Sequence, residues 1–278
     1  MLSYRHSFHA GNFADILKHI VLVEALEYLT KKNKPFDYID SHAGAGLFNL
    51  ESAHSNKLAE HISGISKLKS KEWPELSQYL DIVNNLNHSS VLRAYPGSPL
   101  IAMHFIRPKD NAWLYELHPV DFDLLRKNTR SHKRVKVMCQ DGLKGALSHL
   151  PPLSRRALVL IDPSYEIKTD YRTVFDTIQT AYKKFSTGIY LLWYPVVDRR
   201  KVIELERRFI SSGIRDIQRY ELGLSPDRSG HGMNSSGMIV INPPWGLFEK
   251  MSQLLPKLVA TLGLEEGAFS KCDALVGE

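Results

Sequence analysis

The chain has 278 residues, 43% of them hydrophobic, and a formal net charge of +6, so its composition is that of a globular protein with a full core. No uncharged apolar run approaches the ~18 residues that a membrane span needs, and the polar first residues give no reason to expect an export signal. Two cysteines, Cys139 and Cys272, are too few for a disulfide framework or a zinc cluster, so we expect a cytoplasmic protein.

The first predicted helix follows a basic and aromatic segment. Asn12 and Asp15 can cap its start, because their side chains accept hydrogen bonds from the first backbone N–H groups. Apolar residues recur at helical spacing as far as Ala25, and a proline ends the pattern. By composition alone, Tyr4 and Phe8 are read as a hydrophobic anchor, and the basic residues as a solvated cap.

A short strand is predicted at 36–40, and it ends in a glycine-rich turn, DSHAGAG, at 40–46. Such a turn lets a ligand approach the backbone closely, although a plain tight turn fits equally well. A dinucleotide site would need a third glycine, where Asn49 stands, and an acidic residue ~20 positions later. Glu51 comes too early for that role, which weakens the interpretation as an oxidoreductase.

Residues 47–96 interrupt the alternation of strands and helices with two helical patterns, near 52–68 and 73–88. Ser98 and the proline after it can then start an apolar helix. We interpret this helix as the one that follows the first strand, with its start pointing at the glycine turn and Ser98 at the ligand. The sequence therefore predicts a single domain, 1–278, with an inserted helical subdomain at 47–96.

The rest of the chain alternates regularly between strands and helices and shows no internal repeat. This alternation predicts a largely parallel sheet covered by helices on both faces. A last helix near 246–262 leads into a polar tail. The further strands are predicted at 112–115, 134–139, 157–161, 189–194, 215–223 and 236–242.

The strand at 157–161 is wholly apolar, as expected for a strand buried on both faces, and it ends in Asp162-Pro163-Ser164-Tyr165. Ligands bind at the carboxyl edge of such sheets. Asp162 and the Pro163 carbonyl can accept the N–H groups of a planar base, and Tyr165 can stack on it, a contact of ~1–3 kcal/mol. This resembles the (D/N/S)PP(Y/F/W) signature of adenine-N6 methyltransferases, with Ser164 in place of the second proline.

Four acidic residues stand at successive strand ends: Asp40, Glu116, Asp141 and Asp162. Each alone is read more simply as a turn or cap residue. Together they have the order found in class I methyltransferases that use S-adenosyl-L-methionine. In that order the glycine turn binds the methionine part of the cofactor. The second acid binds its ribose hydroxyl groups, the third binds its adenine amino group, and the fourth takes part in the reaction.

Segments along nearly the whole chain resemble the RlmJ-type 23S rRNA adenine-N6 methyltransferases, and the first two segments are specific to that family. The segments are YRHSFHAGNFADILKH at 4–19, DSHAGAG at 40–46, YPGSPLIA at 95–102, ELHP at 116–119, DPSYE at 162–166, LWYPVV at 192–197 and SGMIVINPPW at 236–245.

The resemblance implies a Rossmann-like fold with a mostly parallel, seven-stranded sheet. It implies 23S rRNA as the partner and S-adenosyl-L-methionine as the cofactor, and we expect a monomer with no membrane partner. Asp162 would accept the proton, and Tyr4 and His6, with Pro163 and Tyr165, would meet the RNA. The cofactor pocket would be lined by Lys18, His19, His42, Ser98, Glu116, Asp141, Gly142 and Asp162.

Two other features compete with this interpretation. Asn242-Pro243-Pro244-Trp245 matches the methyltransferase signature better than the segment at 162–165 does. It follows the last strand of an expected terminal hairpin, which is antiparallel in this fold class, so we assign it to the opposite edge of the sheet. His6 and His9 are close in sequence but lack cysteine or carboxylate partners at metal-site spacing, so no metal is expected.

Two alternative functions remain open. A DNA adenine-N6 methyltransferase would need a target-recognition domain, and the insertion is short for one. An RNA-binding protein without activity would be expected to lose acidic strand ends, yet all four are present. The basic net charge and the pairs at 155–156 and 199–200 are candidates for an RNA-facing surface, or simply solvated charge.

Overall fold

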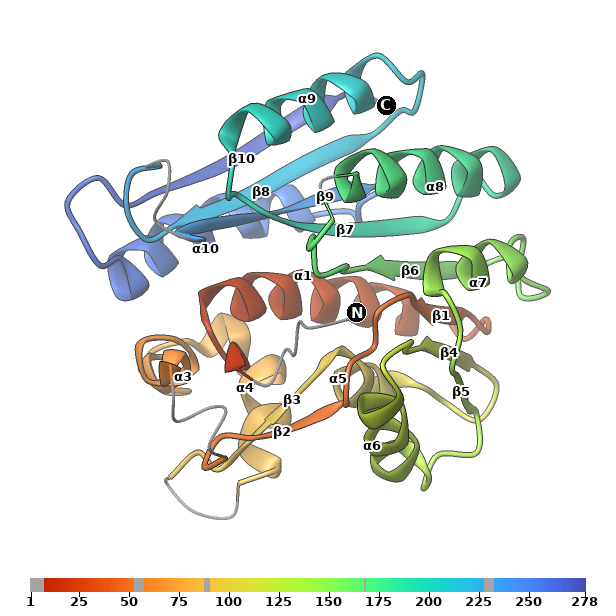
Figure 1. Cartoon of the computed structure of the whole chain (residues 1–278), viewed down its shortest axis with the longest axis horizontal. Coiled ribbons are helices and arrows are strands. Elements are labelled where there is room, and N and C mark those ends of the chain that lie inside the picture. Colours follow the sequence, from red (N-terminus) through yellow and green to blue (C-terminus); the bar gives the residue numbers. More distant parts are fainter. Residues whose placement is uncertain (1–7, 53–57, 88–90, 168, 228–232) are drawn as a thin grey trace.

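The computed structural model describes residues 8–52, 58–87, 91–167, 169–227 and 233–278. Within them, eight strands form one sheet in the order β10-β8-β9-β7-β6-β1-β4-β5 (Figure 1). The strands from β5 to β7 are parallel, whereas β9 is antiparallel to β7 and β8, and β10 to β8. The strands are β1 Asp37–Asp40, β4 Asn111–Tyr115, β5 Val135–Met138, β6 Ala157–Ile161, β7 Ile189–Pro195, β8 Ile217–Gly223, β9 Ser235–Ile241 and β10 Phe269–Val276.

Helices cover both faces of this sheet, because alternate side chains of the central strands are apolar on each face. In β6, Leu158 and Leu160 join one buried cluster, and Val159 and Ile161 join the other. The first cluster contains α1 (Phe13–Thr30), α5 (Ser98–Phe105) and α10 (Leu247–Leu262); the second contains α7 (Gly142–Ser148), α8 (Asp170–Lys184) and α9 (Arg199–Ile210). The helix α6 (Pro119–Thr129) packs against β5 and α5. The predicted fold class, a doubly wound and mostly parallel α/β domain, is confirmed.

The expected strand count of seven is wrong, because the polar tail forms the eighth strand, β10. The sequence indicated only a polar tail here, yet its charged residues face charges directly across the ladder: Lys271 lies opposite Glu221, and Asp273 opposite Arg219. Lys271 Nζ is 2.9 Å from the Glu221 carboxylate, and Arg219 pairs with Asp273. An edge strand needs only one buried face and commonly carries charge, so its sequence lacks the apolar run of a central strand.

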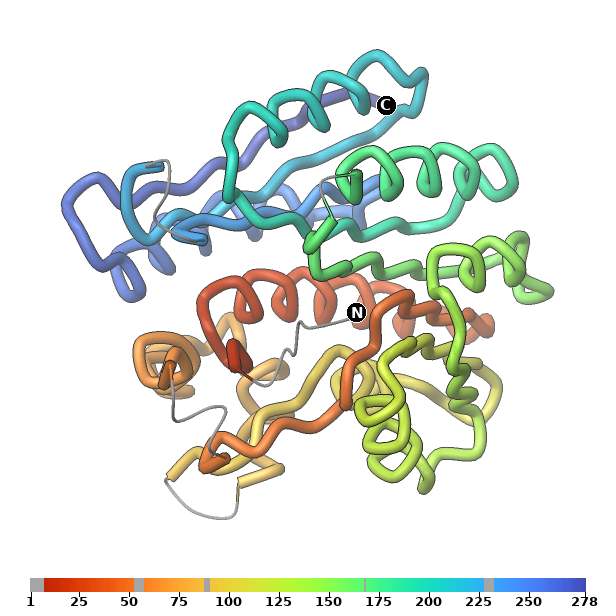
Figure 2. Tube along the Cα trace, viewed as in Figure 1, coloured from red at the N-terminus to blue at the C-terminus, as the bar shows by residue number. Residues whose placement is uncertain are grey.

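The inserted segment is less helical than expected in its described residues, and part of the helix expected near 52–68 (residues 53–57) lies outside them. It contains β2 (Leu47–Asn49), α3 (Glu60–Ser63), two 3₁₀ turns (Ile65–Lys67 and Pro74–Leu76), α4 (Ser77–Asn85) and β3 (Ala94–Pro96), and β2 pairs with β3. Its trace lies beside the start of α1 (Figure 2). Ile65, Trp73 and Tyr79 belong to the same buried cluster as α1, so the segment shares the main core. Its status as a subdomain stays a prediction.

Of the three predicted helix caps, Asn12 is confirmed, and Asp15 and Ser98 are wrong. Asn12 caps α1, since its side-chain oxygen accepts the N–H groups of Ala14 and Asp15. Asp15 instead accepts the Gly11 N–H through its side chain. Ser98 is the first residue of α5 rather than its cap, because its hydroxyl donates to Asp40 at 2.7 Å. In the described part of the chain, none of the helices is both long and apolar enough to cross a membrane.

Candidate active site

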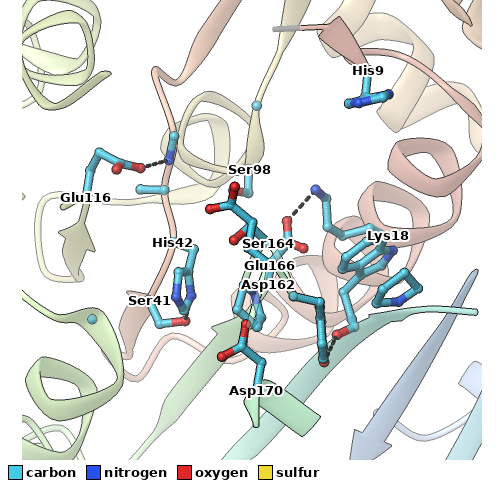
Figure 3. Close-up of a pocket in the computed structure, with 18 of the residues that line it drawn as sticks. His9, Lys18, Ser41, His42, Ser98, Glu116, Asp162, Ser164, Glu166 and Asp170 are labelled. Atoms are coloured by element: carbon cyan, nitrogen blue, oxygen red, sulfur yellow. Dashed lines mark hydrogen bonds and ion pairs between the residues drawn. The ribbon is translucent and has the colours of Figure 1, made fainter. Parts of the chain in front are cut away.

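One cavity of about 450 Å³ lies at the carboxyl ends of the central strands. It brings together residues from α1, the glycine turn, and the loops after β4, β5, β6 and β7 (Figure 3). Tyr4 and His6 lie outside the described residues. Every other predicted site residue lines this cavity: Lys18, His19, His42, Ser98, Glu116, Asp141, Gly142, Asp162, Pro163 and Tyr165.

The glycine turn forms one wall of the cavity, and the buried side chain of Asp40 lies behind this wall. Gly44 and Gly46 have φ values of 59° and 77°, a region that L side chains rarely adopt. The Asp40 carboxylate is fully buried and accepts hydrogen bonds from Tyr38 and Ser98 at 2.7 Å each. Burial raises the pKa of Asp40 to about 6. Of the four strand-end acids, Asp40 therefore lies beneath the cavity, and the other three line it.

Glu116 and Asp141 occupy the strand ends beside the turn. Glu116 accepts the Gly44 N–H at 2.9 Å and the His118 N–H at 2.7 Å, and burial raises the pKa of its carboxyl. Asp141 caps α7 by accepting the N–H groups of Leu143 and Lys144. Both carboxylates are thus oriented by backbone groups before any ligand is considered.

Asp162 is held by a buried lysine on the opposite wall. Lys18 Nζ lies 2.6 Å from Asp162 and 2.9 Å from Asp15, and the Lys18 side chain is only 5% exposed (Figure 3). Burial opposes the charge on Lys18, but Asp15 and Asp162 outweigh it and raise the lysine pKa above its ordinary value. Asp162 is consequently held as a carboxylate in a fixed position.

The sequence did not indicate that Asp15 belongs to this cluster. A usable signal was present: Asp15, Lys18 and His19 are polar residues on the buried face of a helix whose other buried residues are apolar. Charged groups are rarely buried without a partner, so such a set points to an internal ion pair.

Tyr165 is fixed by contacts on the side of β7. Its hydroxyl donates to the Trp193 carbonyl at 2.8 Å, and its ring centroid lies 4.6 Å from that of Tyr171. The Tyr165 backbone has φ 53°, which is uncommon for a bulky residue and costs energy that these contacts offset. These contacts hold the Tyr165 side chain in place although Ser164 replaces the usual proline.

Comparison with known proteins identifies the family. The sequence matches the model described as "Ribosomal RNA large subunit methyltransferase D, RlmJ" over residues 33–273. The chain belongs to the RlmJ family. A relative from Escherichia coli K12, named ribosomal RNA large subunit methyltransferase J, is 48% identical over 264 residues, 94% of each chain. One of the same name from Haemophilus influenzae Rd is 47% identical over 273 residues, 97% of each chain.

A solved structure supports the same assignment. Protein LPL1258 from Legionella pneumophila has a TM-score of 0.88 and 34% sequence identity, covering 96% of this chain and 98% of that one. The match to the RlmJ family confirms the expected enzyme class, a methyltransferase, and its cofactor, S-adenosyl-L-methionine. The roles of individual residues stay predictions.

The residues of the cavity fit the RlmJ cofactor. Gly142 lets the start of α7 pack directly against the glycine turn, since a Cβ there would lie 1.8 Å from the Ser41 carbonyl oxygen. The half-buried carboxylate of Glu116 suits ribose hydroxyl groups, which are hydrogen-bond donors. Burial lowers the pKa of His42 to about 4, so this imidazole is neutral near pH 7, with Nδ1 2.8 Å from the Ser41 hydroxyl.

Replacing Gly142 with alanine is expected to weaken cofactor binding or the fold around it. The new methyl group would displace the Ser41 carbonyl, which is backbone and cannot rotate away, at a cost of ~1–3 kcal/mol. Calorimetric titration with S-adenosyl-L-methionine and the melting temperature measure the two effects. Gly277→Ala is the control, because nothing lies within 4 Å of its Cβ position. Wild-type affinity and stability in Gly142→Ala would contradict this packing.

One competing feature lies apart from this site. The strand β9 runs antiparallel to β7, so Asn242 lies at the opposite edge of the sheet, where its amide donates to the carbonyls of Ser186 and Gly188. The prediction that Asn242-Pro243-Pro244-Trp245 lies at the opposite edge of the sheet is confirmed. Among the described residues, no group of three or more His, Cys, Asp or Glu side chains is placed to hold a metal ion.

Proposed function

We propose that this chain methylates N6 of an adenine in 23S ribosomal RNA. The observation that carries the proposal is Asp162, a carboxylate fixed by Lys18 at the end of β6, in the wall of the cavity that also holds Glu116 and Asp141. Pro163 and Tyr165 lie next to it. Membership of the RlmJ family supports ribosomal RNA as the substrate class, and the relatives from Escherichia coli and Haemophilus influenzae carry that substrate in their names.

The reaction requires the chain to activate a poor nucleophile. The amino nitrogen of adenine reacts slowly because its lone pair is delocalised into the ring. Asp162 and the Pro163 carbonyl accept the two N–H bonds, which favours a tetrahedral nitrogen, and Asp162 takes the proton that the nitrogen loses. When bound, S-adenosyl-L-methionine supplies a methyl group already activated by its sulfonium. Most of the protein's contribution is positioning and fixed charge.

The adenine must leave its stack to enter this cavity. Tyr165 would stack on it, and Tyr4 and His6 would contact the RNA from the N-terminal segment. Among the basic pairs, Arg156 already donates to the Leu29 and Lys34 carbonyls, and Arg199 to Glu221. The Arg200 side chain pairs with Asp198 at 3.3 Å but is 90% exposed, so a phosphate group can still approach it.

We also infer that the protein acts as a cytoplasmic monomer. The nearly full-length match to ribosomal RNA methyltransferases supports a location with the ribosome. Light scattering after size exclusion measures the mass directly, and a single peak near 31.7 kDa is the expected result.

Transfer of labelled methyl groups tests the substrate. Purified protein is incubated with labelled S-adenosyl-L-methionine and either unmodified 23S rRNA or genomic DNA, and the digested nucleosides are identified by mass. N6-methyladenosine from rRNA alone is the expected result. Label in DNA would replace the proposed substrate with the DNA alternative. Label in neither, while the cofactor binds, would point instead to a protein without activity.

A further inference from the structure

Glu60, at the start of α3 in the inserted segment, contacts the residues that lead into α1. Its carboxylate accepts a hydrogen bond from the side-chain amide of Asn12 at 2.9 Å and lies 3.1 Å from Nδ1 of His9. His9 and Asn12 line the cavity, whereas Glu60 stands behind them. The inserted segment is thus connected by polar contacts to the wall of the active site.

These contacts continue without a break to the reacting carboxylate. While Glu60 holds the amide nitrogen of Asn12, the amide oxygen of Asn12 caps α1 with two hydrogen bonds of 3.0 Å. The amide can therefore adopt only one orientation. The first turn of α1 carries Asp15, which lies 2.9 Å from Lys18, and Lys18 lies 2.6 Å from Asp162. The contacts thus form a continuous path from Glu60 to Asp162 through this helix start.

The inserted segment is also fixed to the same place by its backbone. The Ile65 N–H donates to the Gly11 carbonyl at 2.9 Å. A Cβ on Gly64 would lie 2.2 Å from that oxygen, so only glycine allows this approach. Gly11 has φ 78°, which likewise favours glycine. Glu60 is held against Asn12 by this close contact and does not depend on a flexible surface loop.

We propose that Glu60 is a positioning residue for methyl transfer, which acts through Asn12 and the first turn of α1 on Lys18 and Asp162. The inference rests on the proposed role of Asp162. It makes the inserted segment part of the catalytic apparatus, although none of its acidic residues lines the cavity.

The His9–Glu60 pair adds a pH dependence to this arrangement. The hydrogen bond that His9 donates to Glu60 raises the pKa of His9, against the effect of burial and with a further contribution from Asp15. A histidine with a raised pKa stabilises the folded arrangement fully at low pH, and this contribution is lost as the pH rises through the raised value. Above that pH His9 is neutral and holds Glu60 less firmly.

The test compares Glu60→Ala with a matched control, Glu75→Ala. Glu75 lies in the same segment, is 32% exposed as Glu60 is, and pairs with Lys257 at 2.6 Å outside the cavity. Single-turnover methyl transfer is measured at saturating rRNA and cofactor, together with cofactor affinity and melting temperature. The expected result is a rate about 10-fold lower for Glu60→Ala, at unchanged cofactor affinity, and a wild-type rate for Glu75→Ala.

A second variant, Glu60→Gln, separates positioning from stability. It keeps the hydrogen bond to Asn12, so most of the rate should return, but it lacks the charge that holds protonated His9. The fall in rate with rising pH should therefore begin at lower pH than in the wild type. This pH profile remains decisive if Glu60→Ala does not fold.

Three results would overturn the positioning role: a wild-type rate in Glu60→Ala, an equal loss in Glu75→Ala, or a loss confined to cofactor affinity. An unshifted pH profile in Glu60→Gln would do the same. The proposed function fails separately, since a normal rate in Asp162→Ala would contradict the role of Asp162 whatever Glu60 does.

Discussion

Replacing Asp162 with alanine is expected to lower methyl transfer to 23S rRNA by about 100-fold or more. The variant removes the carboxylate that accepts an N–H of the adenine amino group and its proton. It leaves the other wall of the cavity in place, because Lys18 keeps Asp15 as a buried partner at 2.9 Å. The variant should therefore fold and still bind S-adenosyl-L-methionine, so that the loss appears in the rate.

Single-turnover transfer, with cofactor binding measured on the same preparation, checks this prediction. Asp162→Asn is informative beside it, because an amide oxygen still accepts an N–H bond but cannot pair with Lys18; we expect a rate between those of alanine and wild type. Asp176→Ala is the matched control, since Asp176 pairs with Arg172 at 3.7 Å on the exposed side of α8. Undiminished transfer by Asp162→Ala would remove this residue from the chemistry.

The residues of the cavity wall could be predicted where each directly follows a strand that is recognisable in the sequence. Glu116, Asp141 and Asp162 each follow a recognisable strand, and parallel strands end at the same edge, so three acids far apart in sequence were predicted to meet there. All three line the cavity. Asp40 follows the same rule in sequence, but it turns inward to Tyr38 and Ser98, a choice that depends on packing.

Contacts between distant segments could not be predicted in this way. Lys18 and Asp162 are 144 residues apart, and Asn12 and Glu60 are 48 apart, so no local pattern joins them. The strand β10 was missed for a related reason. Its charges are neutralised by residues of β8, and that pairing is visible only once the two strands lie side by side.

Replacing Lys18 with methionine is expected to destabilise the fold by ~3–5 kcal/mol and to abolish methyl transfer. Methionine fills a similar volume but leaves Asp15 and Asp162 facing each other, with side chains only 1% and 14% exposed. Thermal unfolding measures the first effect. Lys144→Met is the control, because the Lys144 side chain is 87% exposed. Equal stability of Lys18→Met and wild type would contradict the buried ion pair.

The stability lost in Lys18→Met should depend on pH in a predictable direction. Lys18 has a raised pKa in the fold, so its contribution is complete below its unfolded pKa of ~10.4 and persists through neutral pH. In the variant, protonation of one carboxylate relieves the repulsion, so the deficit in stability should be large at pH 8 and shrink toward ~pH 4. A deficit independent of pH would indicate lost packing rather than uncompensated charge.

A double variant separates the two roles of Lys18. Asp15→Asn with Lys18→Met removes one of the two facing carboxylates, so most of the stability lost in Lys18→Met should return. Methyl transfer should stay low, because Asp162 keeps its charge but loses the lysine that orients it at 2.6 Å. Recovery of the rate together with the stability would show that Lys18 serves the fold alone. Recovery of stability without the rate would assign Lys18 to the orientation of the reacting carboxylate.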